Sequence, residues 1–155
     1  MSQSYGAKEY DACGIFLNRG KVVATLIMIP IIIIYIFSDK ILIALEQDAA
    51  IAVIAKRYCC ILIPGIWAQS MFDATRKFLS AQFEITIPLY VQFVTLILHF
   101  LWCYLFIIVL DGREVGAAMA TNITYILNMV IVDIICYFKP SIRRTHQGLP
   151  NRLSF

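Results

Sequence analysis

The sequence contains few charged residues and few side chains of the kinds that enzymes use. Only 15% of its 155 residues are Asp, Glu, Lys or Arg, where soluble domains carry about a quarter. It has two histidines, its five cysteines form no CxxC pair, and no HExxH, GxSxG or GxxxxGK[ST] motif occurs. These absences argue against an enzyme, a zinc cluster and a disulfide framework. We therefore expect no catalytic, cofactor-binding or metal-binding residue.

Apolar residues make up 61% of the chain and are gathered into blocks that one small core could not hide. The net charge of +3 comes from bases that are scattered around these blocks and do not line one face. That distribution is unlike a nucleic-acid-binding surface. We therefore expect most of the chain to contact membrane lipid, and we expect no nucleic-acid partner.

The blocks predict an all-α fold, a polytopic membrane bundle of four transmembrane helices. The helices are expected at about residues 22–38, 50–72, 85–110 and 115–138. Lys56 and Arg57 interrupt the second block, so they must snorkel to one interface if that helix is to cross the bilayer. The prediction divides the chain into a cytoplasmic lead-in (1–21), a membrane domain (22–138), and a basic cytoplasmic tail or linker (139–155).

The distribution of basic residues predicts the orientation. The lead-in, the connection between the second and third helices, and the tail together carry nine Lys or Arg residues. The opposite side carries four, even when Lys56 and Arg57 are counted there. The positive-inside rule then places both termini in the cytoplasm. No cleavable signal peptide of the usual form is expected, because the lead-in is long and polar.

Polar residues on the last two predicted helices form stripes. Four side chains of the third helix recur at spacings of three and four, which places them on one face: Gln92, Thr95, His99 and Cys103. The fourth helix begins with small residues that allow close packing, followed by polar ones: Gly116, Ala117, Ala118 and Ala120, then Thr121, Thr124 or Tyr125, and Asn128. Facing stripes predict a hydrated or hydrogen-bonded seam, which either holds helices together or lines a functional cavity.

Two ionisable positions in the predicted helices have more than one interpretation. His99 either relays protons or stays neutral and hydrogen-bonded. Asp133 either contributes to an ion path or anchors the helix near Lys139 at the interface. Gln69 and Asp73 are expected at a capped, partly solvated end of the second helix.

Four segments resemble the multidrug and toxic compound extrusion (MATE) transporters, eukaryotic type. The stretch QSYGAKEYDACGIFLNRG resembles the connector between the second and third helices of that family. The stretches LIPGIWAQSMFDATRKFLSAQ, LILHFLWCYLF and EVGAAMATNITYILN resemble its fourth, fifth and sixth helices, in the right order. The resemblance covers nearly the whole chain and implies a partial N-terminal lobe containing helices three to six.

The resemblance also implies a function. Complete MATE transporters have twelve helices in two lobes, and they extrude organic, often cationic, compounds in exchange for H⁺ or Na⁺ by alternating access. Carried over by position, the first-lobe cavity residues are Gln92, His99, Thr121, Asn122 and Asn128. The first two helices and the second lobe, with the acidic residues usually implicated in cation coupling, have no counterpart here. The resemblance leaves three explanations open for the missing parts: a fragment, a truncated gene model or a reduced paralogue. The expected location is the plasma membrane or the vacuolar membrane.

A non-transporting membrane scaffold or assembly subunit is the alternative. It would use the small residues from Gly116 to Ala120 to dock other membrane helices. The sequence identifies neither the substrate nor the coupling ion nor the oligomeric state.

Overall fold

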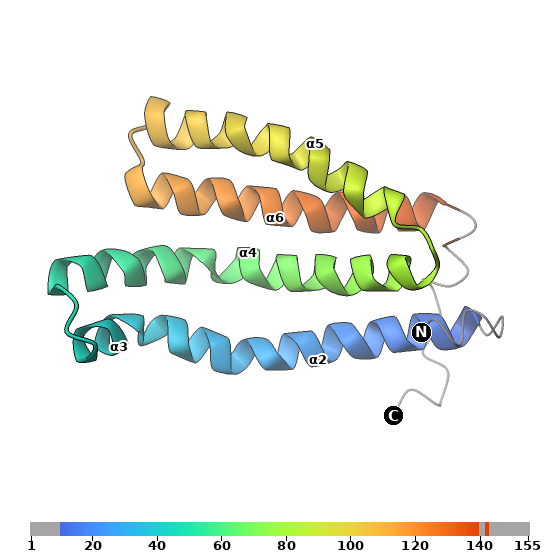
Figure 1. Ribbon diagram of the computed structural model, residues 1–155, viewed down its shortest axis with the longest axis horizontal. Helices are drawn as coiled ribbons and strands as arrows, with labels where there is room; N and C mark the ends of the chain where they lie inside the picture. Colours follow the sequence, from blue (N-terminus) through green and yellow to red (C-terminus); the bar gives the residue numbers. More distant parts are fainter. Residues whose placement is uncertain (1–9, 140–141, 143–155) are drawn as a thin grey trace.

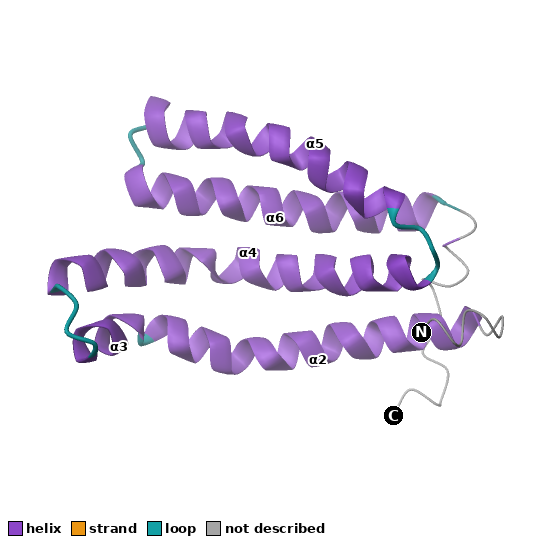
Figure 2. Cartoon of the chain, in the orientation of Figure 1, coloured by secondary structure: helices purple, strands orange, loops and turns teal. Residues whose placement is uncertain are grey.

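The structure is a computed structural model that describes residues 10–139 and residue 142. The described part contains helices and no strand (Figures 1 and 2). Its elements are α2 (Tyr10–Ile36), α3 (Ser38–Ala44), α4 (Ala49–Ala81), α5 (Thr86–Cys103), the π-helix η1 (Tyr104–Val109) and α6 (Arg113–Phe138). Four stretches are long and apolar enough to cross a membrane: Cys13–Ile36, Ala49–Ala81, Thr86–Val109 and Arg113–Phe138. The predicted all-α bundle with four spans is confirmed.

The first helix begins at Tyr10, well before the start that we predicted near residue 22. Cys13 and Leu17 explain the difference, because they lie four residues apart on one helical face and both are buried. The charged and glycine residues around them hide this short apolar stripe from a count of apolar blocks. Residues 10–21 of the predicted lead-in are therefore helical, whereas residues 1–9 lie outside the described residues, as does most of the predicted tail.

The helix α4 continues to Ala81, nine residues beyond the predicted end. Its last turns bury Thr75, Phe78 and Leu79, which recur at helical spacing on the face opposite the charged residues. Gln69 and Asp73 consequently lie within the helix, and the prediction that they mark its end is wrong.

The third span changes from an α-helix to the π-helix η1 where it approaches the start of α6. A Cβ atom on Gly116 would lie 2.4 Å from the Phe106 carbonyl oxygen, so only glycine permits this approach. The backbone N–H of Gly112 donates to the same oxygen at 3.0 Å. The prediction that small residues let a neighbouring backbone come close is confirmed here.

A short helix that we did not predict, α3, follows α2. Its Asp39 accepts a hydrogen bond from Lys56 of α4, with an Nζ–Oδ2 distance of 2.9 Å. Asp48 then caps α4 by accepting from the backbone N–H of Ala50 at 2.7 Å. These contacts fix the turn between the first two spans.

The four long helices lie side by side in the order α2, α4, α6, α5 (Figure 1). The neighbours α4 and α6 run parallel, whereas α2 is antiparallel to α4 and α5 is antiparallel to α6. The start of α2 and the end of α6 therefore lie at one end of the bundle. The core cluster of buried residues is Cys13, Leu17, Phe72, Phe78, Leu79, Val91, Val132, Cys136 and Ile142.

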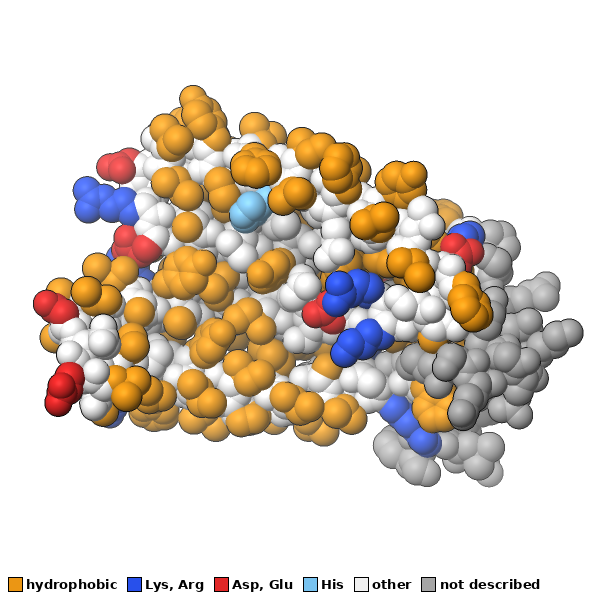
Figure 3. All heavy atoms as spheres, in the orientation of Figure 1, with side chains coloured by type: hydrophobic (Ala, Val, Ile, Leu, Met, Phe, Trp, Pro, Cys, Tyr) orange, Lys and Arg blue, Asp and Glu red, His pale blue; other side chains and the backbone are white. Residues whose placement is uncertain are grey.

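Large apolar side chains cover the outside of the bundle (Figure 3). Only 6% of the most apolar stretch of the first span is buried inside the structure. Even in α6, which has neighbours on both sides, the buried share of its most apolar stretch is 22%. Exposure of such a large apolar surface to water is unfavourable, whereas contact with lipid hydrocarbon or with further membrane helices is favourable. The fold is that of an integral, multi-pass membrane protein.

Candidate functional site

A polar seam joins α5 and α6, which we define as Thr95, His99 and Cys103 of α5 with Thr124 and Asn128 of α6. At one level the Thr95 hydroxyl lies 2.6 Å from Asn128 Oδ1. Both side chains are buried, with 1% and 6% of their surface exposed. The Thr95 hydroxyl also lies 2.9 Å from the Val91 carbonyl of its own helix. Because an unpaired polar group is expensive in this environment, the Thr95 hydroxyl satisfies the Asn128 side-chain carbonyl oxygen.

One turn further along, His99 lies between two other members of the seam. Its Nδ1 is 2.8 Å from Thr124 Oγ1, and its Nε2 is 3.4 Å from Cys103 Sγ. The Thr124 hydroxyl also lies 3.0 Å from the Ala120 carbonyl, to which it can donate. Which ring nitrogen of His99 donates and which accepts depends on the tautomer of the imidazole.

The two levels together confirm the predicted hydrogen-bonded seam. Its side chains bond directly to one another, which is the arrangement expected of residues that hold two helices together. The same geometry gives His99 two hydrogen-bonding neighbours but no carboxylate among the described partners. A proton-relay role for His99 therefore stays a prediction.

Asn122 lies on another face of α6 and contacts α4. Its Nδ2 donates to the Ile61 carbonyl at 2.6 Å. This carbonyl lies next to that of Cys60, which loses its helical donor because Pro64 has no N–H. Gly65 makes room for the contact, since a Cβ there would lie 2.1 Å from Asn122 Oδ1.

The remaining two predicted cavity residues lie apart from the seam. Gln92 lines a groove between α4 and α5 together with Arg76, Lys77 and Ser80. The Thr121 hydroxyl donates to the Ala117 carbonyl of its own helix at 2.9 Å. Of the five predicted positions, only His99 and Asn128 belong to the seam, where they lie at two separate levels with different partners.

A charged contact that the sequence analysis missed links three helices. Lys21 Nζ of α2 lies 3.4 Å from Asp133 Oδ1 of α6, and the Thr75 hydroxyl of α4 lies 3.4 Å from the same oxygen. Lys139 pairs with Glu84 at 2.5 Å. Both interpretations of Asp133, as part of an ion path or as an interfacial anchor near Lys139, stay predictions. Lys21 was assigned to a polar lead-in, so its approach to a membrane acid could not be anticipated.

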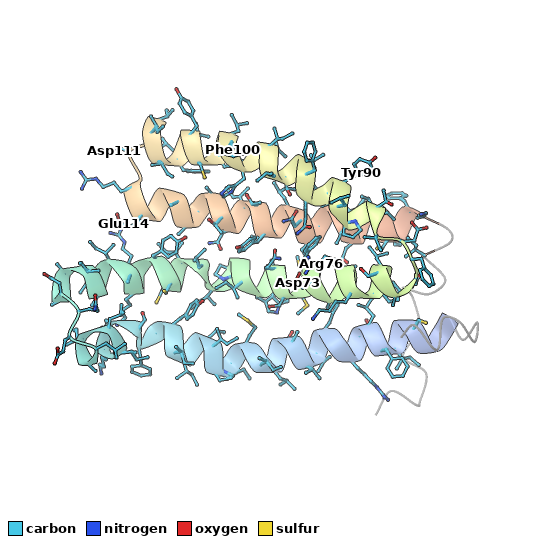
Figure 4. The ribbon with its side chains drawn as sticks, in the orientation of Figure 1. Asp73, Arg76, Tyr90, Phe100, Asp111 and Glu114 are labelled. Atoms are coloured by element: carbon cyan, nitrogen blue, oxygen red, sulfur yellow. The ribbon has the colours of Figure 1, made fainter. Side chains whose placement is uncertain are left out.

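Between α2 and α4 lies a cavity of about 430 Å³ with a mostly apolar lining. Its polar members are Ser70, Asp73 and Lys77. Figure 4 shows Asp73 beside Arg76 on α4, with their charged atoms 2.9 Å apart. Within the described residues no group of three His, Cys, Asp or Glu side chains could hold a metal ion.

Several buried polar atoms have no hydrogen-bond partner within the described part of the chain. They include Gln69 Oε1, Trp102 Nε1 and Asn122 Oδ1. Such atoms usually pair with water or with another polypeptide segment. Asn122 is thus a predicted cavity position that retains a free acceptor.

Comparisons with known proteins agree with this architecture. A family model described as MatE matches residues 1–105. Two Arabidopsis thaliana proteins are similar: Protein DETOXIFICATION 17, 32% identical over 147 residues, and Protein DETOXIFICATION 16, 34% identical over 146 residues. Each match covers 94% of this chain but only 31% and 30% of those proteins, so the chain spans a little under a third of their length.

A solved structure has the same arrangement of helices. It is described as the crystal structure of eukaryotic MATE transporter AtDTX14, and it superposes with a TM-score of 0.89 at 25% sequence identity. The superposition covers 99% of this chain and 34% of that chain.

Proposed function

The chain belongs to the MatE family, and from this we propose that it forms one part of a multidrug and toxic compound efflux transporter. In the complete form, an inward flow of H⁺ or Na⁺ drives the export of organic, often cationic, compounds. The observation that carries the proposal is the arrangement of the four spans, which is shared with a solved transporter over nearly the whole chain. No resident cofactor is required, because the ion gradient supplies the energy.

We place the first-lobe cavity at the predicted residues Gln92, His99, Thr121, Asn122 and Asn128. One observation supports this choice: Asn122 Oδ1 lacks a hydrogen-bond partner in the described part. Uncharged amide and hydroxyl groups suit an organic cation that must bind and then leave, because they bind it more weakly than a carboxylate.

Orientation and location complete the proposal. Both termini lie on the cytoplasmic side of either the plasma membrane or the vacuolar membrane, so the turn between α4 and α5 is cytoplasmic. The nine-to-four distribution of basic residues between the two sets of predicted connections in the sequence supports this orientation.

Transport by a complete protein containing this chain tests the function. Proteoliposomes are loaded with a fluorescent organic cation, and its movement is followed under an imposed H⁺ gradient, an Na⁺ gradient or neither. We expect exchange with one of the two gradients and its loss when an ionophore collapses that gradient. Transport that ignores both gradients would contradict ion coupling, and no transport of any organic cation or anion tested would contradict the function.

The scaffold alternative is less well supported by the structure. Its proposed docking surface begins at Gly116 and includes Ala118 and Ala120, and these residues are buried within the chain itself. The backbone of η1 already fills the space next to Gly116. Other membrane helices are still expected as partners, but on the exposed apolar faces of the spans.

A further inference from the structure

A groove of about 470 Å³ lies where the end of α4 meets the start of α5. We call it the α4–α5 groove. One part of its lining is polar and the other is apolar. The polar part comprises Arg76, Lys77, Ser80 and Gln92, and the apolar part comprises Ile85, Pro88 and Leu89.

The charges of the groove leave one positive charge without a counterion. Arg76 Nη2 lies 2.9 Å from Asp73 Oδ1, so one guanidinium shares one carboxylate. Lys77 is exposed and makes no ion pair with any residue that the structure describes. Figure 3 shows basic and acidic side chains together on this face of α4, within a surface that is otherwise largely apolar or uncharged. A ligand that carries negative charge fits this arrangement.

The depth of these groups corresponds to a membrane interface. Arg76 and Lys77 precede the end of α4 by five and four residues, which is about 6–8 Å along a helix. Gln92 follows the start of α5 by six residues and so lies at about the same level.

The apolar part of the groove leads directly onto the lipid-facing side of α5. Leu89, Phe93 and Leu96 succeed one another at helical spacing, and each exposes half or more of its surface. A small soluble anion would contact only the polar part of the groove. A molecule with both a phosphate and a hydrocarbon chain would contact the polar part and the apolar part.

We propose that the α4–α5 groove binds the headgroup of an anionic glycerophospholipid. Arg76 and Lys77 hold the phosphate, and the Gln92 amide donates to a phosphate or ester oxygen. The Ser80 hydroxyl already donates to the Arg76 carbonyl at 2.9 Å, so it serves as an acceptor for a headgroup hydroxyl or amine. One acyl chain lies along Leu89 and Phe93. The proposal concerns the lipid around the chain and does not depend on the transported compound.

Lipid selectivity of the purified 155-residue chain in nanodiscs tests the site. The discs contain phosphatidylcholine with one-third phosphatidylserine, and native mass spectrometry after extraction counts the retained lipids of each class. We expect retention of phosphatidylserine over phosphatidylcholine. In Arg76→Gln/Lys77→Gln this preference should fall by about fivefold for each base removed, since a base near an anionic surface contributes about that factor.

Two further variants separate a built site from general electrostatics. Lys40→Gln/Arg57→Gln removes two exposed bases at the opposite end and should leave the preference within twofold of the parent. Gln92→Leu keeps every charge and should still lower the preference, by about threefold to tenfold, the factor for one hydrogen bond. Circular dichroism checks that each variant keeps its helices.

Three results would overturn the proposal. These are equal loss in both double variants, no effect of Gln92→Leu in a folded protein, and displacement of the retained phosphatidylserine by millimolar inorganic phosphate. The last result would assign the groove to a free anion and not to a lipid.

Discussion

At the residue scale, several polar groups inside the bundle form pairs that span two helices. Thr95 pairs with Asn128, His99 with Thr124, and Asn122 with the Ile61 carbonyl, all within 2.8 Å. In lipid an isolated polar side chain has no water with which to form a hydrogen bond. Each pair therefore constrains which helix faces meet. The helical spacing of the polar residues was enough to predict one shared face on each helix. The identity of each partner depended on the rotation and offset of the helices, which spacing alone does not contain.

The Thr95–Asn128 bond gives a prediction about stability. Thr95→Val and Asn128→Leu each remove one partner, and their coupling in a double-mutant cycle should be about 0.6 kcal/mol, with an upper bound of about 1.7 kcal/mol. Unfolding in mixed detergent micelles, followed by circular dichroism, measures the three free energies. Thr121→Val is the matched control, because within the described part of the chain that hydroxyl bonds to the Ala117 carbonyl of its own helix and not to another helix. Strict additivity of the two single changes would show that the bond contributes nothing.

Glycines give a second residue-scale prediction, because the space around them differs. Gly116→Ala should destabilise the bundle by about 1–3 kcal/mol, since its new methyl group would meet the Phe106 carbonyl oxygen, a backbone atom that cannot move alone. Gly20→Ala has nothing within 4 Å and should stabilise α2 by up to about 1 kcal/mol. The same detergent unfolding measurement compares them. Equal effects at the two sites would contradict the close approach of η1 to α6.

At the element scale, helix existence followed from composition, but helix ends did not. The apolar blocks located all four spans. The real ends at Tyr10 and Ala81 lie outside the blocks, because amphipathic turns with buried residues such as Leu17 and Phe78 extend the helices past the uninterrupted apolar stretches. The π-helix η1 left no signal, since its cause is the approach of Gly116 from a later helix.

The contact between α3 and α4 should depend on pH. The hydrogen bond from Lys56 holds the pKa of Asp39 below its ordinary value of 3.8. A lowered carboxyl pKa means that the ion pair stabilises the fold above about pH 4 and that this contribution is lost as the pH falls through the lowered value. Asp39→Asn should therefore speed hydrogen exchange in α3 at pH 6, whereas the difference should vanish once the pH falls below the lowered pKa of Asp39.

Comparing Asp39→Asn with the parent at each pH cancels the intrinsic pH dependence of exchange. Glu46→Gln, an exposed change just after α3, is the control and should show no difference at either pH. A difference between Asp39→Asn and the parent that persists at low pH would mean that the carboxylate charge is not the cause.

At the scale of the whole molecule, the antiparallel order of the spans alternates the connections between two sides. The turn after α4 lies at the end where α2 begins, and the turns after α3 and after η1 lie at the other end (Figure 1). The sequence predicted this alternation from the number of spans and predicted the cytoplasmic side from the bases. It could not predict that α4 and α6 are neighbours, because contacts between apolar faces in lipid depend on shape and not on composition.

Labelling from outside intact cells tests the orientation. In a background with all five cysteines replaced by serine or alanine, single cysteines are placed at Glu46, Asp111 and Ser80, which are all exposed. An impermeant maleimide should label Glu46→Cys and Asp111→Cys in intact cells, and Ser80→Cys only after permeabilisation. The experiment is done in the plasma membrane of a heterologous host, and the reverse pattern would invert the proposed topology.

The parallel pairing of α4 with α6 has a consequence for biogenesis. These two helices form the largest interface of the bundle, yet all of α5 lies between them in the chain. During synthesis α4 must wait in the bilayer until α6 leaves the translocon, while α5 and α6 can associate as a hairpin as soon as both are made. The centre of the bundle therefore closes last, and a ribosome that stalls before α6 leaves behind an exposed helix for membrane quality control to recognise.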